Sequence, residues 1–218
     1  AKIPLTDPDD LHECYVTLTA LAQELETKFS PPVQIIANYT GGTKTMTAAL
    51  VITALEAEGV ELQLVTGGRG DLVRVRDGSQ ASITVGVEGI RLRRAMAPYL
   101  AAWERHGYAE AAAGLRGLAL PRDSALRGEL LIARDLSCAF DAWDRFDNAA
   151  ALRILEDYRV RIGQKQGHLI AFLGMLLAQD PRQTPAQLWD LWLNARRKGA
   201  QARYDDAIAR LYRLTECT

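Results

Sequence analysis

The chain has 218 residues, of which 48% are hydrophobic and 24% are charged, and its formal net charge at pH 7 is -1. A chain of this length and composition buries a substantial core and forms one large domain or two small ones. Acidic and basic residues are interspersed and nearly balanced, so the sequence excludes nonspecific binding to nucleic acid or to a membrane surface through bulk charge. Any anionic ligand must therefore be bound by local groups.

The cysteines and the apolar runs indicate a cytoplasmic protein. Cys14, Cys138 and Cys217 lie far apart and in no metal or redox spacing, which favours reduced thiols. No signal peptide is visible, and the longest apolar run, LIAFLGMLLA, is too short to span a bilayer. We therefore expect no membrane partner. Because the chain starts without an initiator methionine and a helical pattern still runs at its last residues, we expect a fragment of a longer protein.

Two kinds of pattern follow one another along the chain. Residues 1–90 mix helical and strand patterns, whereas residues 91–218 show helical patterns throughout. The expected fold class is therefore α/β followed by all-α. The first domain should begin with a helix in DPDDLHECYVTLTALAQELETKF, capped by Asp7 or Asp9. The strand VQIIANY follows, and its continuous apolar character suits a sheet covered on both faces.

A helix after residue 45 and the strand ELQLVT complete a strand–helix–strand unit. Its two strands should be parallel and its crossover right-handed. Further along, Val73 and Val75 alternate with arginines, and Asp77-Gly78 favours a hairpin turn. We expect a small antiparallel ribbon at the edge of the sheet.

The loop NYTGGTKT, residues 38–45, joins the first strand to the following helix. Such a loop lies at the carboxyl end of the sheet, where open α/β folds bind ligands. Glycines allow a ligand to approach the backbone, the helix N-terminus favours an anion, and lysine adds a charge suited to phosphate. The order of residues is neither that of a Walker A loop nor G-x-G-x-x-G, so ATP hydrolysis is disfavoured. The alternative is a tight turn with a solvated lysine. The candidate ligand residues are Asn38, Thr40, Gly41, Gly42, Thr43, Lys44 and Thr45.

Three features together resemble a known family. They are Thr-Gly-Gly-Thr-Lys between a strand and a helix, Val-Thr-Gly-Gly-Arg after the next strand, and the hairpin that follows. This arrangement resembles the CRISPR-associated Rossmann fold (CARF) sensor domains, and more narrowly the Cas02710 family. The segments AWDRFDNAAAL and RYDDAIARLYR also resemble parts of that family. The family usually has an acidic residue where this chain has Asn38, and its glycine-containing first strand is not recognisable before Ala1, so part of the sensor should be missing.

The resemblance implies a Rossmann-like parallel sheet and a ligand, cyclic oligoadenylate, the messenger of type III CRISPR antiviral defence. It also implies a homodimer with the ligand on the two-fold axis, and no cofactor. Two facing loops would present two Lys44 side chains to a ring of phosphates, which suits an isologous interface. Arg69 is a further candidate for ligand contact, against the alternative of a surface arginine.

The helical domain, 91–218, is expected to be the output. In many CARF proteins the output is a HEPN ribonuclease whose motif is Arg, four to six residues, then His, and RIGQKQGH, from Arg161 to His168, has that spacing. Such a pair could stabilise a phosphorane and move a proton during attack by an RNA 2′-hydroxyl. The alternative is a chance match, with the family's motif beyond Thr218, in which case the chain binds its signal without cutting RNA.

Three functions stay open at this point. The chain is a sensor that activates a ribonuclease, a ring nuclease that cleaves its own messenger with help from Lys44, or a regulatory module without catalysis. No metal-ligand or paired-carboxylate pattern is recognisable in the sequence. The segment GAQARYDDAIARLYR also resembles one helix of a tetratricopeptide repeat, and without a second copy at that period it is interpreted as a single packed helix.

Overall fold

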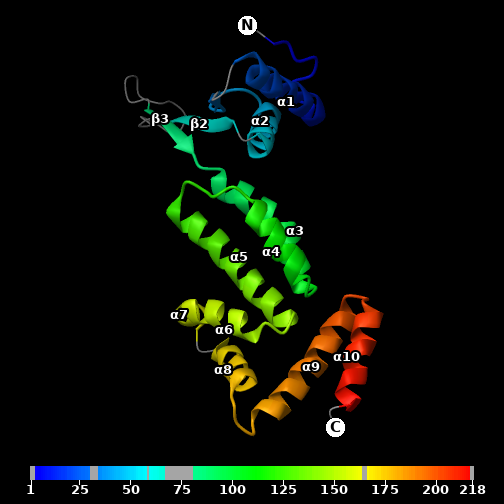
Figure 1. The fold of residues 1–218 in the computed structure, drawn as a ribbon. Coiled ribbons are helices and arrows are strands. Elements are labelled where there is room, and N and C mark those ends of the chain that lie inside the picture. Colours follow the sequence, from blue (N-terminus) through cyan, green and yellow to red (C-terminus); the bar gives the residue numbers. More distant parts are fainter. Residues whose placement is uncertain (1–2, 30–33, 58, 67–80, 164–165, 217–218) are drawn as a thin grey trace. The chain divides into compact units, whose positions relative to one another are not determined.

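The computed structural model describes residues 3–29, 34–57, 59–66, 81–163 and 166–216 (Figure 1). Contacts between residues divide the chain into two compact units, residues 1–93 and 94–218. The boundary lies inside the helix α3, Glu88–Glu104. The functional labels given to the two expected domains stay predictions.

The first unit combines helices with a small mixed sheet. Its elements, before the start of α3, are α1 (Leu11–Lys28), β1 (Ile35–Asn38), α2 (Lys44–Glu56), β2 (Val60–Thr66) and β3 (Ala81–Val85). The strand order is β1-β2-β3. β1 and β2 run parallel, with Ile35 opposite Val60, and α2 connects them, so the predicted strand–helix–strand unit with parallel strands is confirmed.

β3 pairs antiparallel with β2, so that Leu62 lies opposite Val85. The prediction of an antiparallel strand at the edge of the sheet is therefore confirmed. The predicted turn residues, Val73, Val75 and Asp77-Gly78, lie outside the described residues.

The start of α1 differs from the expectation. Its N-cap is Asp10, whose carboxylate accepts a 3.0 Å hydrogen bond from the backbone N–H of Glu13. Asp7 instead accepts from the backbone N–H of Asp9 at 2.9 Å, which forms a turn before the helix. The prediction of Asp7 or Asp9 as the cap is therefore wrong. Several acidic residues in a row make the exact cap ambiguous from sequence, because each is a good cap by type.

Helices α1 and α2 cover one face of the sheet. The apolar core of this unit joins residues of both helices to the strands, with Ala22, Ala54, Val60, Leu62 and Val87 buried. The opposite face is polar and exposed in the part of the chain that is described. Ile36 is 54% exposed there, and Glu61 and Gln63 accept 2.7 Å hydrogen bonds from hydroxyls of β3. The expectation of a sheet covered on both faces is not met by these residues.

The second unit is helical throughout its described residues, which confirms that helices follow the α/β start. After the second half of α3, its elements are α4 (Tyr108–Gly117), α5 (Ser124–Asp144), α6 (Asn148–Asp157), α7 (Arg159–Ile162), α8 (Gly167–Leu177), α9 (Gln183–Ala200) and α10 (Tyr204–Glu216). No helix in the described ranges is long and apolar enough to cross a membrane.

One turn geometry recurs between successive helices of this unit. Each turn has a non-glycine residue in the left-handed region, with φ near 60°: His106 (63°), Phe146 (64°) and Ala202 (58°). The next residue's backbone N–H closes the helix end with a bond to the carbonyl five positions back: Gly107 to Ala102 (2.8 Å), Asp147 to Ala142 (2.9 Å) and Arg203 to Lys198 (3.0 Å). This six-to-one bond is the Schellman arrangement that ends many helices.

The turns define three helical hairpins, α3–α4, α5–α6 and α9–α10, at unequal intervals along the chain. In each, a buried alanine follows the left-handed residue by five positions, namely Ala111, Ala151 and Ala207. RYDDAIARLYR lies in the one helix α10 apart from its first residue, and the hairpins follow no fixed period, which agrees with its interpretation as a single packed helix. The three hairpins themselves were not predicted, because their intervals differ and little besides the turn and this alanine is shared.

Candidate functional site

The loop between β1 and α2 is held by Thr43. Thr43 is the N-cap of α2, and its hydroxyl accepts a 3.2 Å hydrogen bond from the backbone N–H of Met46. The same hydroxyl donates to the carbonyl of Pro8 at 2.9 Å, which fixes the loop against the segment before α1. The backbone N–H groups of Lys44 and Thr45, in the same first turn, make no hydrogen bond among the described residues.

Asn38 and Thr40 hold the other end of the loop. Oδ1 of Asn38 accepts from the backbone N–H of Thr40 at 2.9 Å and from its hydroxyl at 2.6 Å. The Thr40 hydroxyl in turn accepts from the backbone N–H of Val65 on β2 at 2.7 Å. These two side chains therefore position the loop relative to the sheet. Asn38 does so through its neutral amide, so this role needs no acidic residue at that position.

The two glycines differ in what they do. Gly42 has φ of 100°, a conformation that side chains disfavour, so a glycine is needed there to make the turn. A Cβ at Gly41 would meet nothing within 4 Å among the described residues. Both residues are exposed. Open space therefore lies beside Gly41, while Gly42 makes the turn of the backbone.

Lys44 is the first residue of α2 and is exposed. Its ammonium forms no ion pair with any residue in the described ranges, and the first turn of α2 has no acidic residue. Thr45 is half-buried beside it. Lys44 is thus a solvent-accessible positive charge at the positive end of a helix. Arg69, the other basic candidate of this site, lies outside the described residues.

Arg161 and His168 lie on different helices. Arg161 is exposed on the four-residue helix α7, and His168 is the second residue of α8. Gly163, with φ of 72°, ends α7 between them. Near Arg161, burial and a hydrogen bond to Asp135 raise the pKa of Tyr158 to about 12, and the charge of Arg161 opposes that rise. The structure thus places the pair on separate elements.

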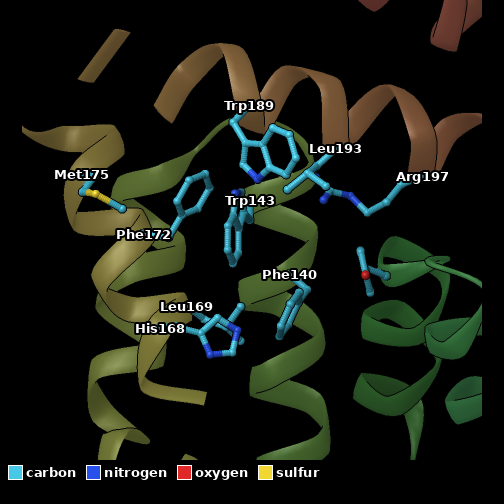
Figure 2. Close-up of a pocket in the computed structure, with 10 residues that line it drawn as sticks. Phe140, Trp143, His168, Leu169, Phe172, Met175, Trp189, Leu193 and Arg197 are labelled. Atoms are coloured by element: carbon cyan, nitrogen blue, oxygen red, sulfur yellow. The ribbon is translucent and has the colours of Figure 1, made fainter. Parts of the chain in front are cut away.

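The helical unit contains a pocket that sequence reasoning missed (Figure 2). Its volume is about 420 Å³, and its lining residues are Tyr108, Phe140, Trp143, His168, Leu169, Phe172, Met175, Trp189, Leu193 and Arg197. They come from α4, α5, α8 and α9. A repeated i, i+3 or i+4 spacing of aromatics on α5, α8 and α9 was the available signal, but such spacing is also that of an ordinary helical core.

A polar cluster lies next to this pocket, at the end of α5. Asp144 is buried, and its carboxylate pairs with Lys198 and accepts a 3.1 Å hydrogen bond from Nε of Arg197. Asn194 donates to the same carboxylate at 3.0 Å. The partly buried His106 has its pKa lowered, first by loss of solvent and then by the charge of Arg197. These groups join α5 to α9.

No group of three or more His, Cys, Asp or Glu side chains suited to a metal ion occurs within the described residues. A comparison with protein-family models gives no match, and a search among curated proteins gives none either.

Proposed function

We propose that the chain is a sensor of cyclic oligoadenylate, bound at the loop between β1 and α2. The observation that carries the proposal is the geometry of that loop. A capped helix N-terminus, two exposed glycines and the exposed Lys44 lie together at the carboxyl end of a parallel strand. Backbone N–H groups at a helix start, together with an adjacent positive charge, bind phosphate in many proteins.

The groups have separate roles in this proposal. The free N–H groups of Lys44 and Thr45 donate to a non-bridging phosphate oxygen, and the ammonium of Lys44 supplies charge. Gly41 leaves room for the ribose-phosphate backbone to approach. Asn38, Thr40 and Thr43 hold the loop through the hydrogen bonds described above. Arg69 is proposed as a further phosphate contact.

The proposal also includes a more specific fold and a homodimer. The β1–α2–β2 unit would be the centre of a Rossmann-like CARF sheet of the Cas02710 type, and a homodimer would place two such loops around one symmetric ring. The helical unit would be the output. A HEPN ribonuclease activity through Arg161 and His168 has no support from their placement on separate helices, so RNA cleavage is the weaker part of the proposal.

Incubation of the chain with cyclic tetra-adenylate and cyclic hexa-adenylate, each in the presence of a labelled RNA, separates the three functions. Retention of intact messenger in equilibrium dialysis supports a sensor. Slow conversion to linear products indicates a ring nuclease, and messenger-dependent loss of the RNA indicates an active effector. If neither messenger is retained by the folded chain, the proposal is overturned.

A further inference from the structure

The aromatic pocket of the helical unit has the size and lining of a small-molecule site. Sites for small ligands are usually concave, between about 300 and 1,000 Å³, and lined by apolar side chains with a few polar groups. This pocket has about 420 Å³. Figure 2 shows its lining side chains converging from α5, α8 and α9 toward a shared space. The loop at 38–45 belongs to the other unit and plays no part in it.

The aromatic rings of the pocket are fixed in place. Trp143 stacks on Phe140 with ring centroids 5.9 Å apart and lies 6.0 Å from Phe172. Nε1 of Trp143 donates a 3.0 Å hydrogen bond to the buried Asp190, which sets the orientation of the indole. Trp189 stacks on Trp192 at 4.7 Å. A flat ligand would therefore meet aromatic faces, of which Trp189 is 54% exposed, and stacking of this kind adds to the effect of area alone.

The charge of the pocket comes from Arg197. Among the described residues that line it, Arg197 is the permanently charged one, and no carboxylate lines it. The Arg197 side chain is 19% exposed, and its Nε is bonded to Asp144. Its Nη2 forms an ion pair with Oδ1 of Asp190 at 4.0 Å, a separation that is beyond hydrogen-bond distance. Neither Nη1 nor Nη2 makes a hydrogen bond within the described part of the chain.

Because Nη1 and Nη2 of Arg197 make no hydrogen bond among the described residues, this guanidinium beside aromatic rings selects for one ligand chemistry. A cation would be repelled by Arg197. A purely apolar ligand would bury the N–H groups of Arg197 without giving them acceptors, which costs free energy. An anionic group can accept from both nitrogens in the fork geometry of arginine. We propose that this pocket binds a small planar aromatic molecule whose ring lies among Trp143, Phe172 and Trp189 and whose anionic group is bound by Arg197.

Three probes of similar shape and different charge test the assignment: indole-3-acetate, indole and tryptamine. Calorimetry of the whole chain should give the highest affinity for the anionic indole-3-acetate and the lowest for the cationic tryptamine. The expected gap between indole-3-acetate and indole is about tenfold, the scale of one charge-assisted hydrogen bond. Equal or tighter binding of tryptamine, or no heat from any probe at millimolar concentration, would overturn the proposal.

Matched variants on α9 separate the role of Arg197 from a general loss of charge. Arg197→Gln should remove the preference for indole-3-acetate over indole. Arg196→Gln should leave it, because Arg196 stacks over Trp192 and does not line the pocket. Phe172→Leu should weaken the binding of all three probes. If circular dichroism shows that Arg197→Gln does not fold, this variant tests whether the probes bind in the pocket. Equal effects of Arg197→Gln and Arg196→Gln would contradict the assignment.

Discussion

Nε1 of Trp143 on α5 donates a hydrogen bond to Oδ1 of Asp190 on α9, and both side chains are buried. The other carboxylate oxygen of Asp190 has no hydrogen-bond partner within the described residues. Burial raises the pKa of Asp190, against the opposing effects of Arg197 and of the Trp143 hydrogen bond. Asp190 therefore links α5 to α9, and its raised pKa makes the stability of this unit depend on pH.

Asp190→Asn should gain stability relative to the wild-type chain as pH rises above about 4. A carboxyl whose pKa is raised by folding stabilises the native state below its unfolded pKa, and this contribution is lost as pH rises through the folded pKa. Asparagine has no such loss and still offers an acceptor to Trp143. Urea unfolding of both chains at a series of pH values measures the difference. The assignment would be contradicted if the difference in the free energy of unfolding did not change with pH, or if rising pH favoured the wild-type chain.

Asp144→Ala should destabilise the helical unit by about 3 to 5 kcal/mol, the range for breaking a buried ion pair. The buried ammonium of Lys198 would lose its partner, and Arg197 would lose its hydrogen bond. Replacing the pair together, as Asp144→Leu with Lys198→Met, should be less harmful than Asp144→Leu alone. Asp141→Ala is the control, because its partner Arg145 is 66% exposed and such pairs contribute little. Equal losses for Asp144→Ala and Asp141→Ala in urea unfolding would argue against a buried cluster.

Ala202→Gly should stabilise the α9–α10 turn by about 0.5 to 1 kcal/mol. Ala202 has φ of 58°, where its Cβ is strained and glycine is not. The same substitution inside α10, Ala209→Gly, should destabilise by about 1 kcal/mol, because Ala209 is exposed and helical. Thermal melting of the two variants tests the opposite signs. Two losses of similar size would show that the turn is not left-handed.

Gly114→Ala should destabilise the α3–α4 hairpin by about 1 to 3 kcal/mol, the usual cost of overpacking. A Cβ at Gly114 would lie 2.0 Å from the ring of Tyr99, so the ring or the helix must move. Gly117→Ala, in the same helix, meets nothing within 4 Å among the described residues and should be tolerated. Chemical denaturation of both variants distinguishes the two sites, and an unchanged midpoint for Gly114→Ala would show that Tyr99 does not pack there.

The sequence predicted the local structure well where one strong signal was present. The parallel strand–helix–strand unit follows from an apolar run, a pair of glycines and the helical pattern after them. The prediction that β1 is covered on both faces is not met, because Ile36 is 54% exposed. Ile36 belongs to an apolar run yet faces away from α1 and α2, and periodicity in so short a strand cannot tell which face is covered.

The helical unit shows why the rest escaped prediction. The repeated hairpins depend on a backbone conformation that His106, Phe146 and Ala202 share despite unlike side chains. The aromatic pocket depends on the contact between α5 and α9, which includes the hydrogen bond from Trp143 to Asp190. These two residues are distant in sequence. Contacts of this kind are set by tertiary packing and leave no short motif to be recognised.

The central claim is tested most directly by calorimetric titration of cyclic tetra-adenylate and cyclic hexa-adenylate into the chain, with ATP as the competitor control and salt held fixed. One ring should bind tightly, and Lys44→Ala should weaken it by about 1.5 to 3 kcal/mol, the range for a hydrogen bond to a charged group. Lys28→Ala, an exposed lysine at the end of α1, should leave the affinity unchanged. Equal affinities for the Lys44 and Lys28 variants, or no binding of either ring by the folded chain, would contradict phosphate recognition at the loop.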